Sequence, residues 1–137
     1  MKKTDDILNS SILIVDDSTV NIILLSRILI GVGFSFISST TKPEEVCALH
    51  AANAYDLILL DIQMPGMDGF EVMKGLKSLK IDALLPILVL SAQPNHELAS
   101  LSAGALDFVS KPFKLADLVS RIKNILNKSF EARQLLI

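Results

Sequence analysis

Five short runs of apolar residues recur along the chain, separated by longer segments of mixed polarity. The runs are rich in Ile, Val and Leu and lack the alternation of apolar and polar residues that a strand with one solvent-exposed face shows. This composition is typical of strands that are buried on both faces in a parallel sheet. The predicted strands are Ser11–Val15, Asp56–Leu60 and Pro86–Leu90, with weaker candidates at Phe34–Ser39 and Ala105–Val109.

The segments between these runs place apolar residues three or four positions apart, which is the spacing of one helix face. The predicted helices are Ser18–Ile30, Lys42–Ala52, Phe70–Leu79 and Leu115–Leu126, with a weaker one within Asn95–Ala103. Strands that alternate with helices predict right-handed crossovers and a doubly wound α/β domain with a parallel sheet and helices on both faces. Because ligands bind at the carboxyl ends of the strands in such sheets, residues at those ends are the candidate functional residues.

Length and composition limit the possible classes of protein. The chain has 137 residues, of which half are hydrophobic, so it is expected to fold as one domain with a sizeable core rather than to be disordered. Its 13 basic residues are outnumbered by 15 acidic ones, so direct nucleic-acid binding is not expected. No apolar run approaches the roughly 20 residues of a membrane span, and the single cysteine cannot form an internal disulfide. We therefore expect a cytoplasmic protein without membrane insertion.

Chemically reactive side chains follow four of the five predicted strands. The first strand ends at Asp16 and Asp17, the third at Asp61, the fourth at Ser91 and the fifth at Lys111. Three carboxylates that converge raise one another's pKa unless a cation lies among them, and oxygen ligands of this kind suit Mg²⁺. A lysine amine and a serine hydroxyl beside them predict a site for an anionic group. Each residue alone also has a structural explanation as a helix cap, turn acid or surface residue, but their coincidence at one edge favours a site.

The order of these motifs resembles the receiver domain of two-component response regulators, including the chemotaxis regulators. The resemblance rests on Asp16-Asp17, on the run from Asp61 to Gly69 (DIQMPGMDG), on Ser91-Ala92 and on the run from Ala103 to Phe113 (AGALDFVSKPF). It implies a flavodoxin-like, five-stranded parallel sheet with strand order 2-1-3-4-5. It also implies a receiver domain at residues 10–128, an N-terminal tail at 1–9, and a C-terminal tail or helix extension at 129–137.

The resemblance further implies the roles of the site residues. Asp61 is the phosphoacceptor, taking a phosphoryl group from the phosphohistidine of a sensor histidine kinase or a histidine phosphotransfer protein. Ser91 and Lys111 assist as the hydroxyl that follows the phosphoryl group and as its counter-ion, and the peptide bond between Lys111 and Pro112 is expected to be cis. The implied Mg²⁺ ligands are Asp16, Asp17, Asp61 and the main-chain carbonyl of Gln63. A domain of this kind catalyses its own phosphorylation and dephosphorylation and is not a conventional turnover enzyme.

Ser91 and Phe108 are the switch residues that the resemblance implies. When Ser91 moves to the phosphoryl group, it leaves space into which Phe108 turns, and the surface around the fourth helix, fifth strand and fifth helix changes as a shift between two existing packings. The last helix is a candidate route to a homodimer or to an output domain. Its apolar spacing continues to Leu136, so it either extends as an amphipathic arm or frays after about Leu126.

Two other classes share parts of this pattern. Dehalogenase-like phosphatases also use an aspartyl phosphate and Mg²⁺, but they need a second acid two residues after the nucleophile, where this chain has Gln63. A receiver-like domain that signals without phosphorylation usually lacks one of the site residues, and all of them are present here. Gly31-Val-Gly33 follows a predicted helix rather than a strand, so it predicts a helix end and no dinucleotide site. Cys47, His50 and His96 are given no role.

Overall fold

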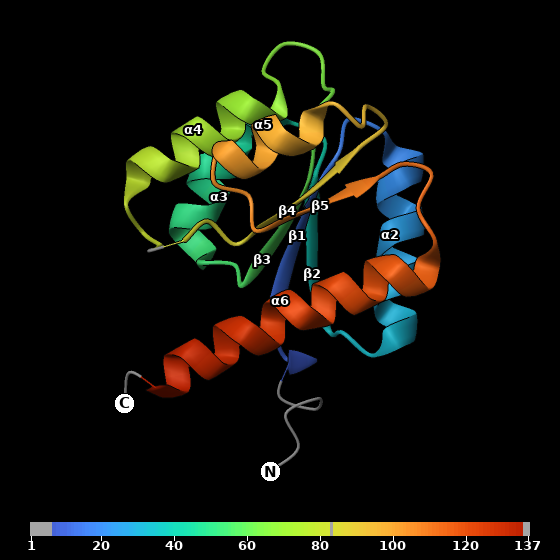
Figure 1. Cartoon of the computed structure of the whole chain (residues 1–137), viewed down its shortest axis with the longest axis vertical. Helices are drawn as coiled ribbons and strands as arrows, with labels where there is room; N and C mark the ends of the chain where they lie inside the picture. Colours follow the sequence, from blue (N-terminus) through green and yellow to red (C-terminus); the bar gives the residue numbers. More distant parts are fainter. Residues whose placement is uncertain (1–6, 83, 136–137) are drawn as a thin grey trace.

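A parallel five-stranded sheet forms the centre of the computed structural model, which describes residues 7–82 and 84–135 (Figure 1). The strand order is β2-β1-β3-β4-β5, as predicted. The strands are β1 (Ser11–Val15), β2 (Phe36–Thr40), β3 (Leu57–Asp61), β4 (Ile87–Ser91) and β5 (Asp107–Ser110). The two edge strands are the ones that the sequence marks most weakly, because an edge strand buries less of its surface than a central one.

The strand register brings the reactive ends into line. Val15 pairs with Leu60 across β1 and β3, Asp61 pairs with Leu90 across β3 and β4, and Ser91 pairs with Ser110 across β4 and β5. Every residue of β3 and β4 is buried, including the terminal Asp61 and Ser91. The polar residue that ends each of these two strands is therefore placed at one edge of an otherwise apolar sheet.

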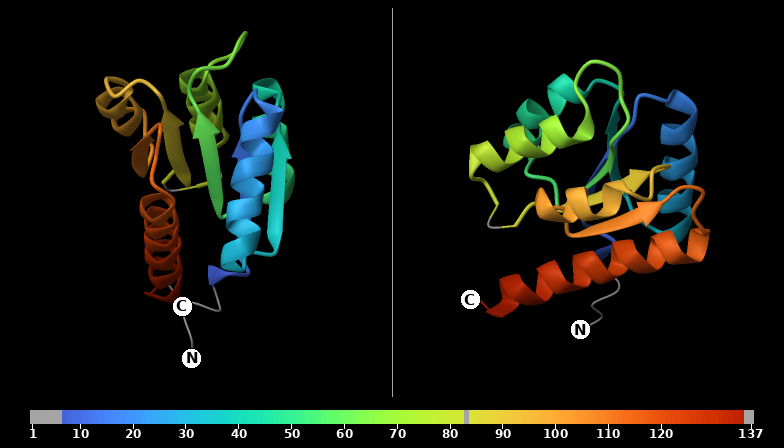
Figure 2. Two further views of the ribbon diagram at one scale, coloured as in Figure 1. Left: turned by 90° about the vertical axis from the view of Figure 1, so that its right-hand side faces the viewer. Right: turned by 45° about the horizontal axis from the view of Figure 1, so that its top comes forward.

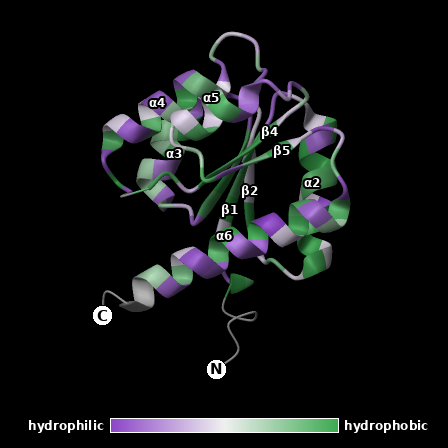
Figure 3. Cartoon of the chain, viewed as in Figure 1, coloured by the Kyte–Doolittle hydropathy of each residue, from purple (hydrophilic) through white to green (hydrophobic). Residues whose placement is uncertain are grey.

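Helices cover both faces of the sheet (Figure 2). They are α2 (Thr19–Val32), α3 (Val46–Asn53), α4 (Gly69–Leu79), α5 (His96–Ser102) and α6 (Leu115–Leu135). One core packs α2 and α6 against the sheet, and the other packs α3 and α4 against its opposite face. Figure 3 shows the apolar strands enclosed between helices whose outer faces are mixed in polarity. This is the three-layer arrangement that the sequence predicts.

Most element boundaries differ from the predicted ones by one or two residues, and the differences are larger at the start of α3 and the end of α6. The helix predicted from Lys42 begins instead as a 3-10 turn, Pro43–Glu45, and becomes α-helical at Val46. The second and fifth strands begin two residues later than predicted. α6 continues to Leu135, nine residues beyond the predicted helix end at Leu126.

The predicted N-terminal tail, residues 1–9, is only partly a tail. Ile7 is 2% exposed and belongs to the core between the sheet, α2 and α6. Residues 1–6 lie outside the described part of the chain. Among the residues that are described, no helix combines the length and apolar character needed to cross a membrane.

Candidate functional site

The first acidic pair, Asp16 and Asp17, lies where β1 passes into α2. Asp16 is 1% exposed, and its carboxylate accepts hydrogen bonds from the backbone N–H of Ser18 at 2.9 Å and from the side-chain amide of Asn21 at 3.3 Å. Ser18 is the N-cap of α2, since its hydroxyl accepts a hydrogen bond from the backbone N–H of Asn21. The first turn of α2 therefore fixes Asp16, whereas the exposed Asp17 faces solvent.

Asp61, the last residue of β3, is held by the tight start of α4. Gly69 begins that helix and donates its backbone N–H to the carbonyl of Ile62 at 2.9 Å. A Cβ atom at Gly69 would lie only 2.8 Å from the carbonyl oxygen of Asp61 and 2.7 Å from the side chain of Ile62. Asp68 and Glu71 form a capping box at the same helix end. Because Gly69 has no Cβ atom, the start of α4 can pack directly against the backbone of Asp61 and Ile62, and this packing fixes the position of Asp61.

The carboxyl group of Asp61 is in an unfavourable environment for a negative charge. Burial raises its pKa above the ordinary value, and the charges of Asp16 and Asp17 raise that pKa further. The ammonium group of Lys111 and a hydrogen bond from the backbone of Gln63 lower the pKa and offset part of this effect. The charged form of Asp61 is therefore stabilised by any additional positive charge that enters the site.

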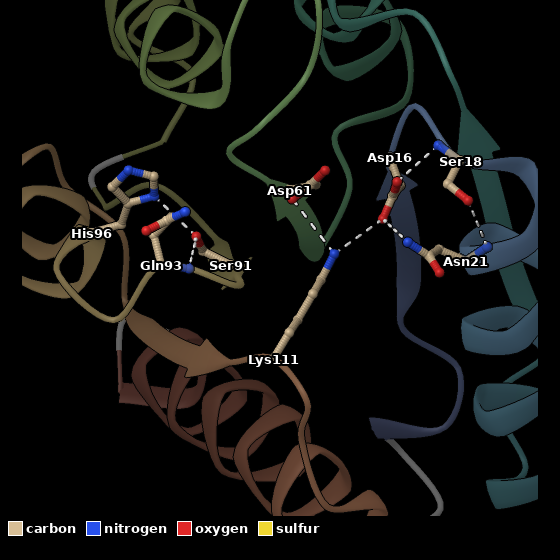
Figure 4. A network of polar contacts seen from close by, with 8 residues as sticks. All are labelled: Asp16, Ser18, Asn21, Asp61, Ser91, Gln93, His96 and Lys111. Atoms are coloured by element: carbon tan, nitrogen blue, oxygen red, sulfur yellow. Dashed lines mark hydrogen bonds and ion pairs between the residues drawn. The ribbon is translucent and has the colours of Figure 1, made fainter.

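Lys111 follows β5 and points across the site between the two buried acids (Figure 4). Its Nζ lies 3.5 Å from Asp61 Oδ1 and 3.6 Å from Asp16 Oδ2. Its backbone N–H donates to the carbonyl of Ser91 at 2.8 Å, which ties the ends of β4 and β5 together. The peptide bond between Lys111 and Pro112 is cis, as the resemblance implies.

The three acids fit a divalent cation. Carboxylate oxygens of Asp16, Asp17 and Asp61 all lie within 4.8 Å of one another. Three carboxylates and the single ammonium group of Lys111 leave two uncompensated negative charges, which a divalent ion balances. Oxygen ligands from one exposed and two buried acids suit Mg²⁺, which keeps part of its water shell in protein sites. The predicted fourth ligand, the carbonyl of Gln63, stays a prediction.

The hydroxyl of Ser91 lies in the site but is directed away from Asp61 (Figure 4). Ser91 is fully buried, and its Oγ is 2.9 Å from Nδ1 of His96 and accepts a hydrogen bond from the backbone N–H of Gln93 at 3.1 Å. The loop between β4 and α5 thus holds the hydroxyl. Sequence reasoning missed His96 because it considered the residue as a possible metal ligand only; its position, five residues after Ser91 at the start of a helix, is the signal that could have found it.

Phe108 is only 4% exposed and belongs to the core on the α3 and α4 side of the sheet. The resemblance implies that this ring turns inward once Ser91 moves, but here it is buried while Ser91 still contacts His96. A phenyl ring has no hydroxyl that needs a polar partner, so its burial in this state is favourable. The movement predicted for Phe108 stays a prediction.

A charged network connects β5 to α6 next to this ring. The guanidinium of Arg121 lies 2.8 Å from the carboxylate of Asp107 and 3.1 Å from that of Asp117, and it also donates to the carbonyl of Phe108 at 3.2 Å. The hydrogen bond to Asp117 raises the pKa of Arg121 above its ordinary value. Sequence reasoning did not identify this network, because Asp107 is fourteen residues from Arg121 and meets it only through tertiary packing.

Known proteins give an independent comparison. A family model described as "Response regulator receiver domain" matches residues 12–123. The chain is 32% identical over 126 residues to the transcriptional regulatory protein YvrH of Bacillus subtilis, covering 92% of this chain and 53% of that protein. It thus spans about half the length of that curated relative.

Two solved structures are similar in fold. The Francisella response regulator 1452 receiver domain has a TM-score of 0.77 and 27% identity, with 89% of this chain and 99% of that chain covered. The CheX-CheY-BeF3-Mg+2 complex from Borrelia burgdorferi contains a chain with a TM-score of 0.76 and 28% identity, with 85% and 88% covered. Together with the acids, hydroxyl and lysine at the carboxyl edge of the sheet, the family match shows that the chain belongs to the response regulator receiver domains.

Proposed function

We propose that the chain accepts a phosphoryl group on Asp61 and responds by changing a protein-binding surface. The observation that carries the proposal is the position of the Asp61 carboxylate: it is buried at the end of β3, within 4.8 Å of two further acids and 3.5 Å from the ammonium of Lys111. An acid placed among like charges and a single cation is suited to hold a divalent ion and an anionic group together.

The transfer step makes one bond and breaks one. A carboxylate oxygen of Asp61 attacks the phosphorus of a phosphohistidine, the new P–O bond forms, and the P–N bond breaks with its electron pair returning to the imidazole, which then takes a proton from solvent. In hydrolysis, water attacks the same phosphorus, and Asp61 leaves as a carboxylate. The Lys111 ammonium compensates charge on the phosphoryl oxygens, and Asp16, held by Ser18 and Asn21, stays in position throughout.

The proposed cofactor is Mg²⁺, held by Asp16, Asp17, Asp61 and the main-chain carbonyl of Gln63. When bound, it supplies positive charge to the oxygens of the transferring group. The support from this chain is the raised pKa of Asp61, since a buried carboxylate among like charges gains most from a cation. The similar chain from Borrelia burgdorferi belongs to a complex with BeF3 and Mg+2, which is consistent with this cofactor for the fold.

The responding surface that we propose lies between α5 and α6. A groove of 380 Å³ there is lined by residues of the loop before α5, of β5 and of the start of α6. Leu98 and Leu101 on α5 expose apolar side chains nearby, at 76% and 42%. In this proposal, movement of Ser91 repositions the loop that leads into α5, and Phe108, which lines the groove, responds as the second switch residue. The partners proposed are a histidine kinase or phosphotransfer protein as donor, and a homodimer or output domain contacted through α6.

We also propose a cytoplasmic location, where kinase donors and reduced thiols such as that of Cys47 are found. The chemistry is self-catalysed phosphorylation and dephosphorylation rather than turnover of an external substrate. The exposed amide of Gln63 occupies the position where a dehalogenase-like phosphatase needs an acid to protonate the leaving group, so sustained hydrolysis of an added phosphate ester is not expected.

The test is intact-mass spectrometry after incubation with Mg²⁺ and phosphoramidate, a small donor with a P–N bond. We expect one phosphoryl group on the wild-type chain and none on Asp61→Asn. Asp56→Asn, at the other end of the same strand, is the matched control and should be phosphorylated like the wild type. A folded wild-type protein without added phosphoryl mass, or Asp61→Asn with it, contradicts the proposal. Steady release of phosphate from p-nitrophenyl phosphate would support the phosphatase instead.

A further inference from the structure

The hydroxyl oxygen of Ser91 makes two polar contacts, with Gln93 and with His96. Its oxygen accepts the backbone N–H of Gln93 at 3.1 Å. The remaining contact, 2.9 Å to Nδ1 of His96, takes the hydroxyl proton when the imidazole is neutral with its proton on Nε2. In that tautomer, Ser91 donates to His96 and accepts from Gln93, so its proton is engaged within the β4–α5 loop.

His96 is itself held in place from several directions. Its backbone N–H donates to the carbonyl of Gln93 at 3.0 Å, and its carbonyl accepts the hydroxyl of the buried Ser100 at 2.6 Å. Its ring packs edge-on against Phe70 of α4, with centroids 5.6 Å apart and planes at 87°. The imidazole is therefore fixed between the loop after β4 and the helix that follows the phosphoacceptor strand.

A hydroxyl has a single proton, so Ser91 cannot donate to His96 and to a phosphoryl oxygen on Asp61 at the same time. We propose that His96 is a positioning residue that holds Ser91 in the resting orientation and thereby lowers the affinity of the site for a phosphoryl group. The inference rests on the proposed function of Asp61. It explains the resting orientation of Ser91, at the end of β4, by its contact with the side chain of His96.

The expected effect follows from the value of one hydrogen bond. The net contribution of one neutral hydrogen bond corresponds to a change of about five-fold in an equilibrium constant, here the dissociation constant of a phosphoryl mimic. His96→Phe keeps an aromatic ring for the edge-on contact with Phe70 and removes the nitrogen that contacts the Ser91 hydroxyl. His96→Asn is the conservative partner variant, because its amide places a polar atom near the position of Nδ1.

The experiment measures the dissociation constant of beryllofluoride, a phosphoryl mimic, in the presence of Mg²⁺ by isothermal titration calorimetry. We expect His96→Phe to bind about three to ten times more tightly than the wild type, and His96→Asn to stay within about two-fold of it. In a Ser91→Ala background, His96→Phe should have no further effect. Equal affinity of His96→Phe and wild type, or the same gain with and without Ser91, overturns the inference, since a merely structural role of His96 does not depend on the Ser91 hydroxyl.

A second readout needs neither metal nor phosphoryl group. In the metal-free protein, Ser91→Ala should shift the ¹⁵N resonance of His96 Nδ1, and an unchanged resonance contradicts the contact even if His96→Phe does not fold. The two hypotheses remain distinguishable. A wild type that takes no phosphoryl group from phosphoramidate contradicts the proposed function, whereas one that is phosphorylated but insensitive to His96→Phe contradicts only the role of His96.

Discussion

The two ends of β3 each carry an acid, and their surroundings are opposite. Asp56, just before the strand, accepts hydrogen bonds from the backbone N–H of Ser11 at 2.8 Å and from its hydroxyl at 3.2 Å. Its own backbone N–H donates back to the carbonyl of Ser11 at 2.9 Å. Asp61, at the far end, is buried near two like charges and is partly compensated by Lys111. Asp56 accepts hydrogen bonds that stabilise the fold, whereas the negative charge of Asp61 is only partly compensated and would be stabilised by a cation.

The comparison shows how the same residue type becomes structural or functional within one strand. At the amino edge, the donors that satisfy Asp56 come from the neighbouring strand, so its charge is accommodated by the sheet itself. At the carboxyl edge, Asp61 lies beside Asp16 and Asp17, and Lys111 and the backbone of Gln63 offset only part of the effect of burial and like charge. We expect changes at the two ends to separate stability from phosphoryl chemistry.

The largest effect on stability is expected at Gly69, where the start of α4 packs tightly against the carboxyl end of β3. Gly69→Ala places a methyl group within 3 Å of the backbone at Asp61 and Ile62, so either β3 or the start of α4 must shift. We expect the free energy of unfolding to fall by about 2 to 3 kcal/mol, measured by urea denaturation followed by circular dichroism. Gly31→Ala, where an added methyl group meets nothing within 4 Å, is the control and should leave stability within about 1 kcal/mol of the wild type. Equal stability of the two variants contradicts the steric explanation.

Asp56→Ala tests the structural acid. It removes a charged acceptor and leaves the donors of Ser11 without it, so we expect a loss of about 2 kcal/mol in the free energy of unfolding. Phosphorylation of the folded fraction by phosphoramidate should be unchanged. Loss of phosphorylation in a variant that is still folded would show that the two ends of β3 are coupled and that the comparison is wrong.

The next effect, stabilisation of the folded protein by Mg²⁺, is expected to be smaller. Mg²⁺ at ten times its dissociation constant should raise the free energy of unfolding of the wild type by about 1.4 kcal/mol. Asp56→Ala should gain the same increment, because its change lies at the other edge of the sheet. Asp61→Asn should gain clearly less, since one of the three acidic ligands is lost. Identical gains in Asp61→Asn and wild type, measured in matched urea titrations, would place the ion elsewhere.

The contrast between the two ends also explains what the sequence can predict. Apolar runs such as Asp56–Leu60 and the acids that follow them predict the strands and the convergence of Asp16, Asp17 and Asp61, because parallel strands share one carboxyl edge. The order of the strands in the sheet was implied by the family resemblance. Contacts made by side chains across loops were not predicted. The bond between Ser91 and His96 depends on loop geometry, and the contact between Arg121 and Asp107 depends on tertiary packing, neither of which is encoded in periodicity.

The smallest expected effect on stability is that of Asp61→Asn itself. Its sign is the sharpest test of the difference between the surroundings of Asp61 and Asp56. Because burial and like charges raise the pKa of Asp61 in the folded protein, the folded state binds its proton more tightly than the unfolded state does. The stability that Asp61 contributes is therefore greatest at low pH and is lost as the pH rises from the ordinary value of 3.8 through the raised folded value. Above that window the charged acid destabilises the metal-free protein.

Replacing Asp61 with the neutral Asn removes this cost. At neutral pH without Mg²⁺, we expect the variant to be more stable than the wild type by about 1 kcal/mol, with the difference shrinking as the pH falls below the raised value. Asp56→Asn should have the opposite sign at neutral pH, because the charge that it removes is well supplied with donors. Urea titrations at several pH values measure both differences. Removing the charge of an acid raises the free energy of unfolding only if that charge is held at a net electrostatic cost in the folded protein. If the two variants change stability in the same direction, the surroundings of Asp56 and Asp61 do not differ in the way that their contacts indicate.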